Sequence, residues 1–157
     1  MKTAFITGGL RGIGLGISQS LLNEGFSLAL CGTREPEFVA EPLNELQRQA
    51  ASGQQIRYYR CNVGEKTDRD NLLQAVRSDF PSMNVLVNNA GVGAKVRDDL
   101  LTMTEENYDW LMKINLQGPF FLTQEAARWM TESKQGNADF SACIVNISSV
   151  SATTVSL

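Results

Sequence analysis

Three glycines near the N-terminus have a spacing that suits phosphate binding. They follow a short apolar run and precede apolar residues at helical spacing, so they occupy a turn between a strand and a helix. Glycines at such a turn let the backbone approach a pyrophosphate, and the N–H groups of the helix N-terminus attract its charge. A tight glycine turn without a ligand is the alternative. The residues expected to line this dinucleotide site are Gly8, Leu10, Arg11, Gly12, Ile13 and Gly14.

The residues that select the dinucleotide are expected at the end of the second strand, where an acid would bind the ribose hydroxyls of NAD. Thr33 and Arg34 lie there, and the first acidic residue after the strand is Glu35. Arg34 and Arg11 can pair with the 2′-phosphate of NADP, because a guanidinium group binds phosphate through two hydrogen bonds. We therefore favour NADP over NAD. Two alternatives stay open: Glu35 serves a ribose, or the arginines are solvated surface side chains.

Asn115, Ser148 and Ser149 are the other polar residues whose positions call for an explanation. Asn115 falls inside a predicted helix, where asparagine is a poor helix former. The two serines follow an apolar strand and either terminate it or present hydroxyl groups to a site. The chain has no histidine, so Ser-His-Asp hydrolysis, Cys-His proteolysis and histidine-based zinc sites cannot be built from it.

The three cysteines, Cys31, Cys61 and Cys143, lie singly in apolar segments. A small buried hydrophobe is the favoured interpretation of each, rather than a nucleophile or ligand. We expect neither a disulfide framework nor a metal site.

The elements that position these residues alternate between strand and helix patterns. A capping box from Thr102 to Glu105 opens a long helical region that runs to about Met130. Apolar strands joined by helices imply a parallel sheet covered on both faces, which predicts a doubly wound, Rossmann-type α/β fold with three αβα layers. Ligands bind at the carboxyl ends of such strands, and the polar motifs lie there. The predicted strands cover Thr3–Thr7, Phe26–Cys31, Ile56–Cys61, Val85–Val87 and Cys143–Ile147.

Composition sets the outer limits. The 157 residues are 43% hydrophobic and show no composition break, which predicts one domain over residues 1–157. The net charge of -3 gives no basic surface for nucleic acid. No apolar run approaches the roughly 20 residues of a membrane span, and no signal pattern opens the chain, so we expect a cytoplasmic protein.

The motifs together resemble the first part of a classical short-chain dehydrogenase/reductase, similar to the 3-oxoacyl-[acyl-carrier-protein] reductases. The resemblance rests on the Gly-x-x-x-Gly-x-Gly spacing after Thr7 and on the Asn-Asn-Ala-Gly segment after the fourth strand. It implies that Asn89, Ala90 and Gly91 line the adenosine ribose. It also aligns Asn62 and Val63 with an Asp-Val pair whose acid faces adenine, and it puts glycine 32 where the family usually has its ribose-binding aspartate.

The same resemblance implies catalytic roles. Asn115 would hold a water of the proton relay, and Ser149 would donate a hydrogen bond to the substrate carbonyl oxygen, with Ser148 as the alternative. The family's proton donor is the tyrosine of a Tyr-x-x-x-Lys motif, which would fall beyond Leu157. None of the three tyrosines, Tyr58, Tyr59 and Tyr108, has a lysine four residues later. The resemblance thus covers the whole chain but leaves out the family's last strands and helices.

The expected function is the NADPH-linked reduction of a ketone or 3-oxoacyl thioester to the alcohol. The small-molecule substrate could be linked to a carrier or to coenzyme A, which Lys95 and Arg97 would suit. The complete protein would form a dimer or tetramer, without nucleic-acid or membrane partners. If the polypeptide ends at Leu157, the alternative is a non-catalytic nucleotide-binding or regulatory module, and we expect such a chain to fold poorly because its fifth strand would be an exposed edge.

Overall fold

Five parallel strands form one sheet in the computed structural model, which describes residues 2–96 and 99–150. Their order is β3-β2-β1-β4-β5, and every neighbouring pair is parallel. The chain moves outward in one direction from β1 to β3 and then returns to the other side of β1, so the order reverses between β1 and β4. The strands are β1 (Lys2–Thr7), β2 (Phe26–Gly32), β3 (Ile56–Arg60), β4 (Val85–Asn88) and β5 (Cys143–Asn146).

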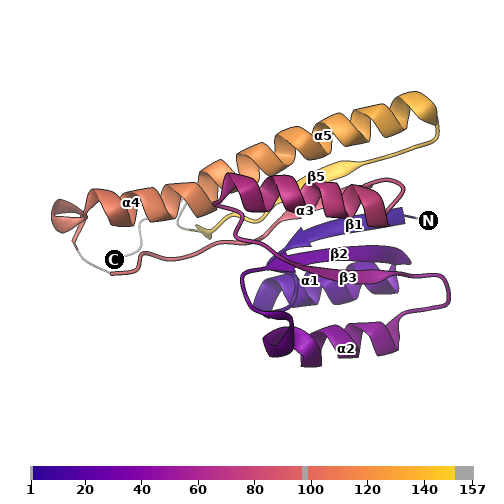
Figure 1. Cartoon of the computed structure of the whole chain (residues 1–157), viewed down its shortest axis with the longest axis horizontal. Helices are drawn as coiled ribbons and strands as arrows, with labels where there is room; N and C mark the ends of the chain where they lie inside the picture. The colour runs from indigo at the N-terminus through magenta and orange to yellow at the C-terminus, as the bar shows by residue number, and fades with distance from the viewer. Residues whose placement is uncertain (1, 97–98, 151–157) are drawn as a thin grey trace.

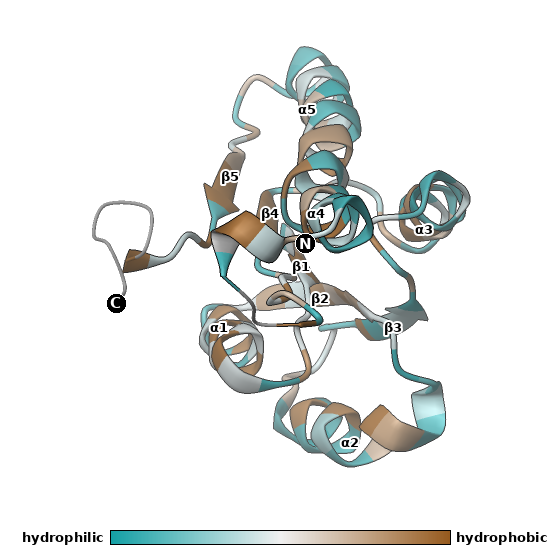
Figure 2. Ribbon diagram, turned by 90° about the vertical axis from the view of Figure 1, so that its left-hand side faces the viewer, coloured by the Kyte–Doolittle hydropathy of each residue, from teal (hydrophilic) through white to brown (hydrophobic). Residues whose placement is uncertain are grey.

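Helices cover both faces of this sheet (Figure 1). Figure 2 shows α1 and α2 on one side, and α3, α4 and α5 on the other. The predicted doubly wound α/β fold with three layers is therefore confirmed. The helices are α1 (Gly12–Asn23), α2 (Ala40–Gln49), α3 (Lys66–Asp79), α4 (Glu105–Met112) and α5 (Gly118–Gly136). Short 3₁₀ helices occur at η1 (Pro36–Val39) and η2 (Leu100–Thr102).

Each face of the sheet has its own apolar core because strand side chains alternate between the two faces. On β1, Ala4 and Ile6 pack toward α1 and α2, where Leu22 and Leu46 are buried. Phe5 points the other way, toward the buried residues of α3 and α5. These two cores hold the carboxyl ends of the strands in a fixed arrangement at one edge of the sheet.

The start of α4 differs from the predicted capping box. Thr104 caps this helix, with its hydroxyl accepting a hydrogen bond from the Asn107 N–H at 3.3 Å. Thr102 instead ends the 3₁₀ helix η2 and donates its hydroxyl hydrogen to the Asp99 carbonyl at 3.0 Å. The predicted box begins two residues before the observed cap. Thr102 and Thr104 both precede the acidic first turn of the helix, and only the backbone conformation distinguishes them. The helical region also continues past Met130, to Gly136.

None of the helices in the described part of the chain is both long enough and apolar enough to span a membrane.

Candidate functional site

A cleft of about 490 Å³ opens at the carboxyl ends of the strands, at the reversal point between β1 and β4. We call it the strand-end cleft. Every residue predicted to bind the dinucleotide lines it. These residues are Gly8, Leu10, Arg11, Gly12, Ile13, Gly14, Thr33, Arg34, Asn62, Val63, Asn89, Ala90 and Gly91. The sequence motifs, although far apart along the chain, meet in one site because all of them follow parallel strands.

The glycine turn is tightly constrained at the floor of the cleft. Gly8 has a φ of 68°, a conformation that L side chains rarely adopt. A Cβ atom on Gly14 would lie 2.1 Å from the Gly8 carbonyl oxygen. Gly14 therefore cannot carry a side chain while α1 begins this close to the end of β1.

The loop after β4 is fastened to this turn. The Asn89 side chain donates hydrogen bonds to the carbonyl groups of Thr7 at 2.8 Å and Gly8 at 3.3 Å. The Thr7 hydroxyl in return accepts hydrogen bonds from the backbone N–H groups of Asn89 and Ala90, at 3.0 and 2.9 Å. The two segments thus form one preformed wall.

Asn62 is held at the end of β3 by bonds on both its main chain and its side chain. Its N–H donates to the Asp68 carboxylate at 2.8 Å, and its Oδ1 accepts the Gly64 N–H at 3.1 Å. An amide oxygen has a second lone pair, and the Nδ2 group is a donor, so the side chain can still pair with an adenine edge. That role stays a prediction.

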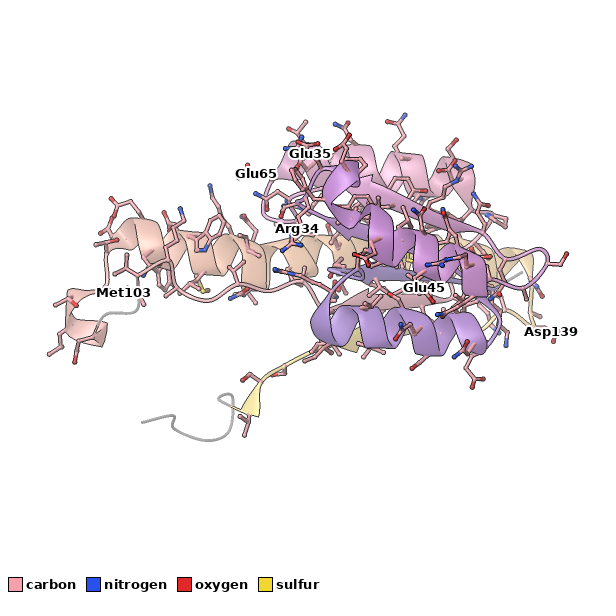
Figure 3. The ribbon with its side chains drawn as sticks, turned by 90° about the horizontal axis from the view of Figure 1, so that it is seen from below. Arg34, Glu35, Glu45, Glu65, Met103 and Asp139 are labelled. Atoms are coloured by element: carbon pink, nitrogen blue, oxygen red, sulfur yellow. The ribbon has the colours of Figure 1, made fainter. Side chains whose placement is uncertain are left out.

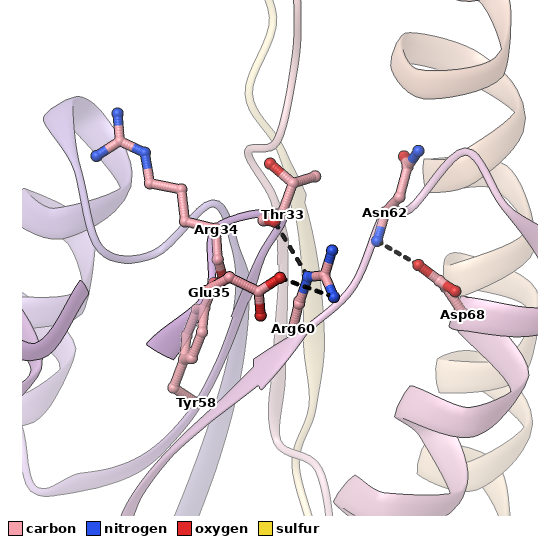
Figure 4. Close-up of polar contacts among 7 residues, drawn as sticks. All are labelled: Thr33, Arg34, Glu35, Tyr58, Arg60, Asn62 and Asp68. Carbon is pink, nitrogen blue, oxygen red and sulfur yellow. Dashed lines mark hydrogen bonds and ion pairs between the residues drawn. The ribbon is translucent and has the colours of Figure 1, made fainter. Parts of the chain in front are cut away.

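The loop that follows β2 is fixed by residues of β3 (Figure 4). The Tyr58 hydroxyl donates to the Arg34 carbonyl at 2.7 Å, and the Arg60 guanidinium lies 3.0 Å from the Glu35 carboxylate. The Tyr58 hydroxyl is protonated at neutral pH, and burial, the main cause, raises its pKa further. A Cβ atom on Gly32 would lie 3.3 Å from the same hydroxyl, so Tyr58 occupies the space beside glycine 32.

Figure 3 shows Arg34, Glu35 and Glu65 grouped in one region of the molecule, well away from Asp139.

A second cavity, of about 680 Å³, adjoins the strand-end cleft and shares Ile13 and residues 89–92 with it. Asn115, Ser148 and Ser149 line this cavity together. The structure therefore brings both predicted catalytic residues to one place, next to the predicted dinucleotide site. Because both serines line the cavity, the choice between Ser149 and Ser148 stays a prediction.

Asn115 lies in η3 (Lys113–Gln117), a π-helical turn that joins α4 to α5. The α-helical region is therefore interrupted at this poor helix former. Its side chain makes two hydrogen bonds to one residue: Oδ1 accepts the Val92 N–H at 2.9 Å, and Nδ2 donates to the Val92 carbonyl at 2.8 Å. π turns of this kind often occur at functional sites. The part of Asn115 in a proton relay stays a prediction.

Two of the three cysteines are buried as predicted, and one is not. Cys31 and Cys61 both line the strand-end cleft. A hydrogen bond with the Cys61 thiol, followed by burial, raises the pKa of Cys31, so this thiol is protonated and unreactive at neutral pH. Cys143 is exposed because β5 lies at the edge of the sheet. In the ranges that the structure describes, no three His, Cys, Asp or Glu side chains lie together as a metal site.

Several residues that position the site are not indicated by any motif. Thr7 belongs to the glycine motif but has no predicted role of its own, and no local pattern indicates the roles of Tyr58, Arg60 and Asp68. Tyr58 and Arg60 are two residues apart on β3, so their side chains lie on the same face of the strand. In the sequence, this spacing is the sign that the two residues act at one place.

Comparisons with known proteins agree with this arrangement. The family model for short chain dehydrogenases matches residues 2–156. Diacetyl reductase [(S)-acetoin forming] of Staphylococcus epidermidis is 33% identical over 144 residues, covering 92% of this chain and 54% of that protein. A 3-oxoacyl-[acyl-carrier-protein] reductase of Staphylococcus aureus is 33% identical over 150 residues, which cover 95% of this chain and 56% of that protein.

Solved structures show the same likeness. The 3-oxoacyl-[acyl-carrier protein] reductase of Brucella melitensis in complex with NAD has a TM-score of 0.87 at 35% identity, covering 99% of this chain and 58% of that one. A metagenomic short-chain oxidoreductase in complex with NADP has a TM-score of 0.84 at 27% identity, over 98% of this chain and 63% of that one. The chain therefore spans little more than half the length of the proteins it matches.

Proposed function

We propose that this chain, which belongs to the short-chain dehydrogenase family, provides the cofactor cleft of an NADPH-linked reductase that converts a ketone or 3-oxoacyl thioester to its alcohol. The observation that carries this proposal is the composition of the strand-end cleft. A glycine turn, two arginines and the loop after β4 meet there, beside a second cavity that holds Asn115 and Ser149.

The residues present fit a dinucleotide. The Cβ atoms that Gly8 and Gly14 lack would lie 3.0 and 2.5 Å from the Asn89 amide nitrogen, so glycines are required for this wall to form. Gly12, which begins α1, offers the N-terminal N–H groups of that helix to phosphate. When bound, the nicotinamide supplies or accepts a hydride.

The preference for NADP is supported by charge. Arg11 and Arg34 are exposed and line the same cleft, where each can pair with a 2′-phosphate. Glu35, the nearest candidate acid for a ribose, is engaged by Arg60 at 3.0 Å. Both observations favour the phosphorylated cofactor.

In the reaction, Ser149 would donate a hydrogen bond to the substrate carbonyl oxygen, which gains negative charge as the carbon is reduced. Asn115 would keep the loop after β4 in place through Val92, which lines both cavities. Dimer or tetramer assembly and a cytoplasmic location belong to the same proposal. The exposed rings of Phe120 and Phe121 on α5 support assembly.

The cofactor assignment is tested by replacing Arg34. In the protein, Arg34→Ala should weaken NADPH binding by about 1–3 kcal/mol, because a charged hydrogen bond to phosphate is lost. NADH binding should hardly change, since NADH has no 2′-phosphate. Titration calorimetry with both cofactors measures this. Equal losses for NADPH and NADH, or a wild-type preference for NADH, would contradict the assignment.

The substrate class is tested by NADPH consumption with simple ketones, diketones and 3-oxoacyl thioesters of coenzyme A and carrier protein. Lys95, in the loop after β4, lies 4.4 Å from the centre of the Trp110 ring, and Trp110 lines the strand-end cleft. Arg97 lies outside the described residues. Activity with the thioesters alone would support the carrier-linked substrate.

A nucleotide-binding module without turnover is the second candidate. The observation that favours it is that the residues lining the strand-end cleft can bind a dinucleotide without any contribution from the residues that line only the second cavity. Tyr58 and Tyr59 are engaged elsewhere, with the Arg34 carbonyl and the Asp79 carboxylate. NADPH binding without consumption of NADPH across the whole substrate panel would favour this function.

A further inference from the structure

We propose that Arg60 is a specificity-determining residue that favours NADPH over NADH by holding the Glu35 carboxylate away from the cofactor ribose. The inference rests on the proposed function, because Arg60 and Glu35 lie beside Thr33 and Arg34, which line the strand-end cleft. The residues expected to select between NADPH and NADH lie in the loop after β2, and Arg60 adds one residue from β3.

The position of Arg60 follows from the pairing of the strands. It is the last residue of β3 and lies opposite Gly32, the last residue of β2. The side chain therefore emerges beside the loop that starts at Thr33. Its NH1 atom lies 3.0 Å from the Glu35 Oε1 atom, and its Nε donates to the Thr33 carbonyl at 3.5 Å.

The ion pair with Arg60 also separates the Glu35 carboxylate from the guanidinium of the neighbouring Arg34. In Figure 4 the Glu35 carboxylate points toward Arg60, whereas the Arg34 guanidinium extends in the opposite direction. The bond from Tyr58 to the Arg34 carbonyl fixes the backbone between them. Arg34 thus stays available to a phosphate while Glu35 is turned aside.

The ion pair contributes little to folding. The side chains of Arg60 and Glu35 are 60% and 46% exposed, and pairs this exposed have small effects on stability. Removing the pair should therefore leave the fold intact, so that its effect on cofactor binding can be measured. A carboxylate released beside Arg34 would repel the 2′-phosphate of NADPH, whereas it would accept hydrogen bonds from the ribose hydroxyls of NADH.

The test measures the dissociation constants of NADPH and NADH by titration calorimetry. Arg60→Ala should weaken NADPH and tighten NADH, so that the preference for NADPH falls by about tenfold, the scale of a near-surface charge effect. Arg48→Ala is the matched control. It breaks a comparable exposed pair, Arg48 with Glu45, whose two residues both lie on α2 and not in the loop after β2.

Glu35→Gln shows whether the carboxylate is responsible. In that background Arg60→Ala should no longer improve NADH binding, because no carboxylate remains to be released. If the full loss of preference persists there, Arg60 acts on the phosphate directly and the proposal is overturned. It is also overturned if Arg60→Ala leaves the preference unchanged.

Glu35→Gln alone provides a test that does not depend on the folding of an Arg60 variant. NADH affinity should fall by less than about twofold, since an acid already paired with Arg60 contributes little to the ribose. A large loss of NADH affinity would show that Glu35 binds the ribose in the wild type, against the proposal. A wild type that binds neither cofactor, or prefers NADH, would instead contradict the proposed function itself.

Discussion

The hydroxyl of Thr7 links backbone groups from two segments that are distant in sequence. It accepts hydrogen bonds from Asn89 and Ala90 and lies 3.3 Å from the Val87 carbonyl, to which it donates. A hydroxyl has one donor and two acceptor sites, so this single side chain is fully used. Individual side chains of this kind, at strand ends, give the site its geometry.

At this scale we predict that Ser149→Ala, in the full-length enzyme, lowers kcat by about 10²–10³-fold, the usual loss for a donor to a developing oxyanion. NADPH affinity should remain near the wild-type value, because such a donor acts mainly in the transition state. Steady-state kinetics and cofactor titration measure the two quantities. Ser148→Ala is the matched control from the same cavity, and a larger loss there would show that the assignment is shifted by one residue.

The π turn η3 is the element that joins the two cavities. It interrupts the helical region between α4 and α5, and its Asn115 holds Val92 at both backbone groups. Because Val92 lines both cavities, a change in this turn reaches the dinucleotide site and the expected catalytic site together.

For this element we predict that Asn115→Ala lowers the free energy of unfolding by about 1–3 kcal/mol, since two hydrogen bonds to Val92 are lost. NADPH affinity should fall as well. Urea unfolding and cofactor titration measure these effects. Gln117→Ala, in the same turn but outside both cavities, is the control, and an equal response from the two variants would argue against a specific role for Asn115.

At the scale of the whole molecule, the sheet ends on one side with β5. This strand pairs only with β4 among the described strands, and the side chains of Val145 and Ile147 are 41% and 37% exposed. An edge strand that presents backbone groups and apolar side chains favours pairing with another chain.

We therefore predict that residues 1–157, expressed alone, associate rather than remain monomeric, and that they do not oxidise NADPH. Size-exclusion chromatography with light scattering, thermal unfolding and an NADPH assay check these outcomes. Val145→Lys should reduce association, because an edge charge opposes strand pairing. A monomer with a cooperative transition would refute the association claim, and genuine turnover would refute the catalytic one.

The sequence alone determined the fold class and many, but not all, of the residues that line the strand-end cleft. Apolar runs of strand length alternate with helical spacing, which requires a parallel sheet covered by helices. The carboxyl ends of parallel strands share one edge, so motifs after β1, β2, β3 and β4 had to meet. Local patterns were sufficient because each motif lies directly after its own strand.

Only the tertiary structure decided which side chains engage one another. The sequence does not indicate a partner for Glu35, and the structure pairs it with Arg60, the last residue of β3. Asn115 had a predicted effect on its helix, but its partner Val92 lies in another loop. Thr104 rather than Thr102 caps α4 because capping depends on the backbone conformation at one residue. Such contacts join residues that are distant in sequence or equivalent in local pattern, so no periodicity or motif specifies them.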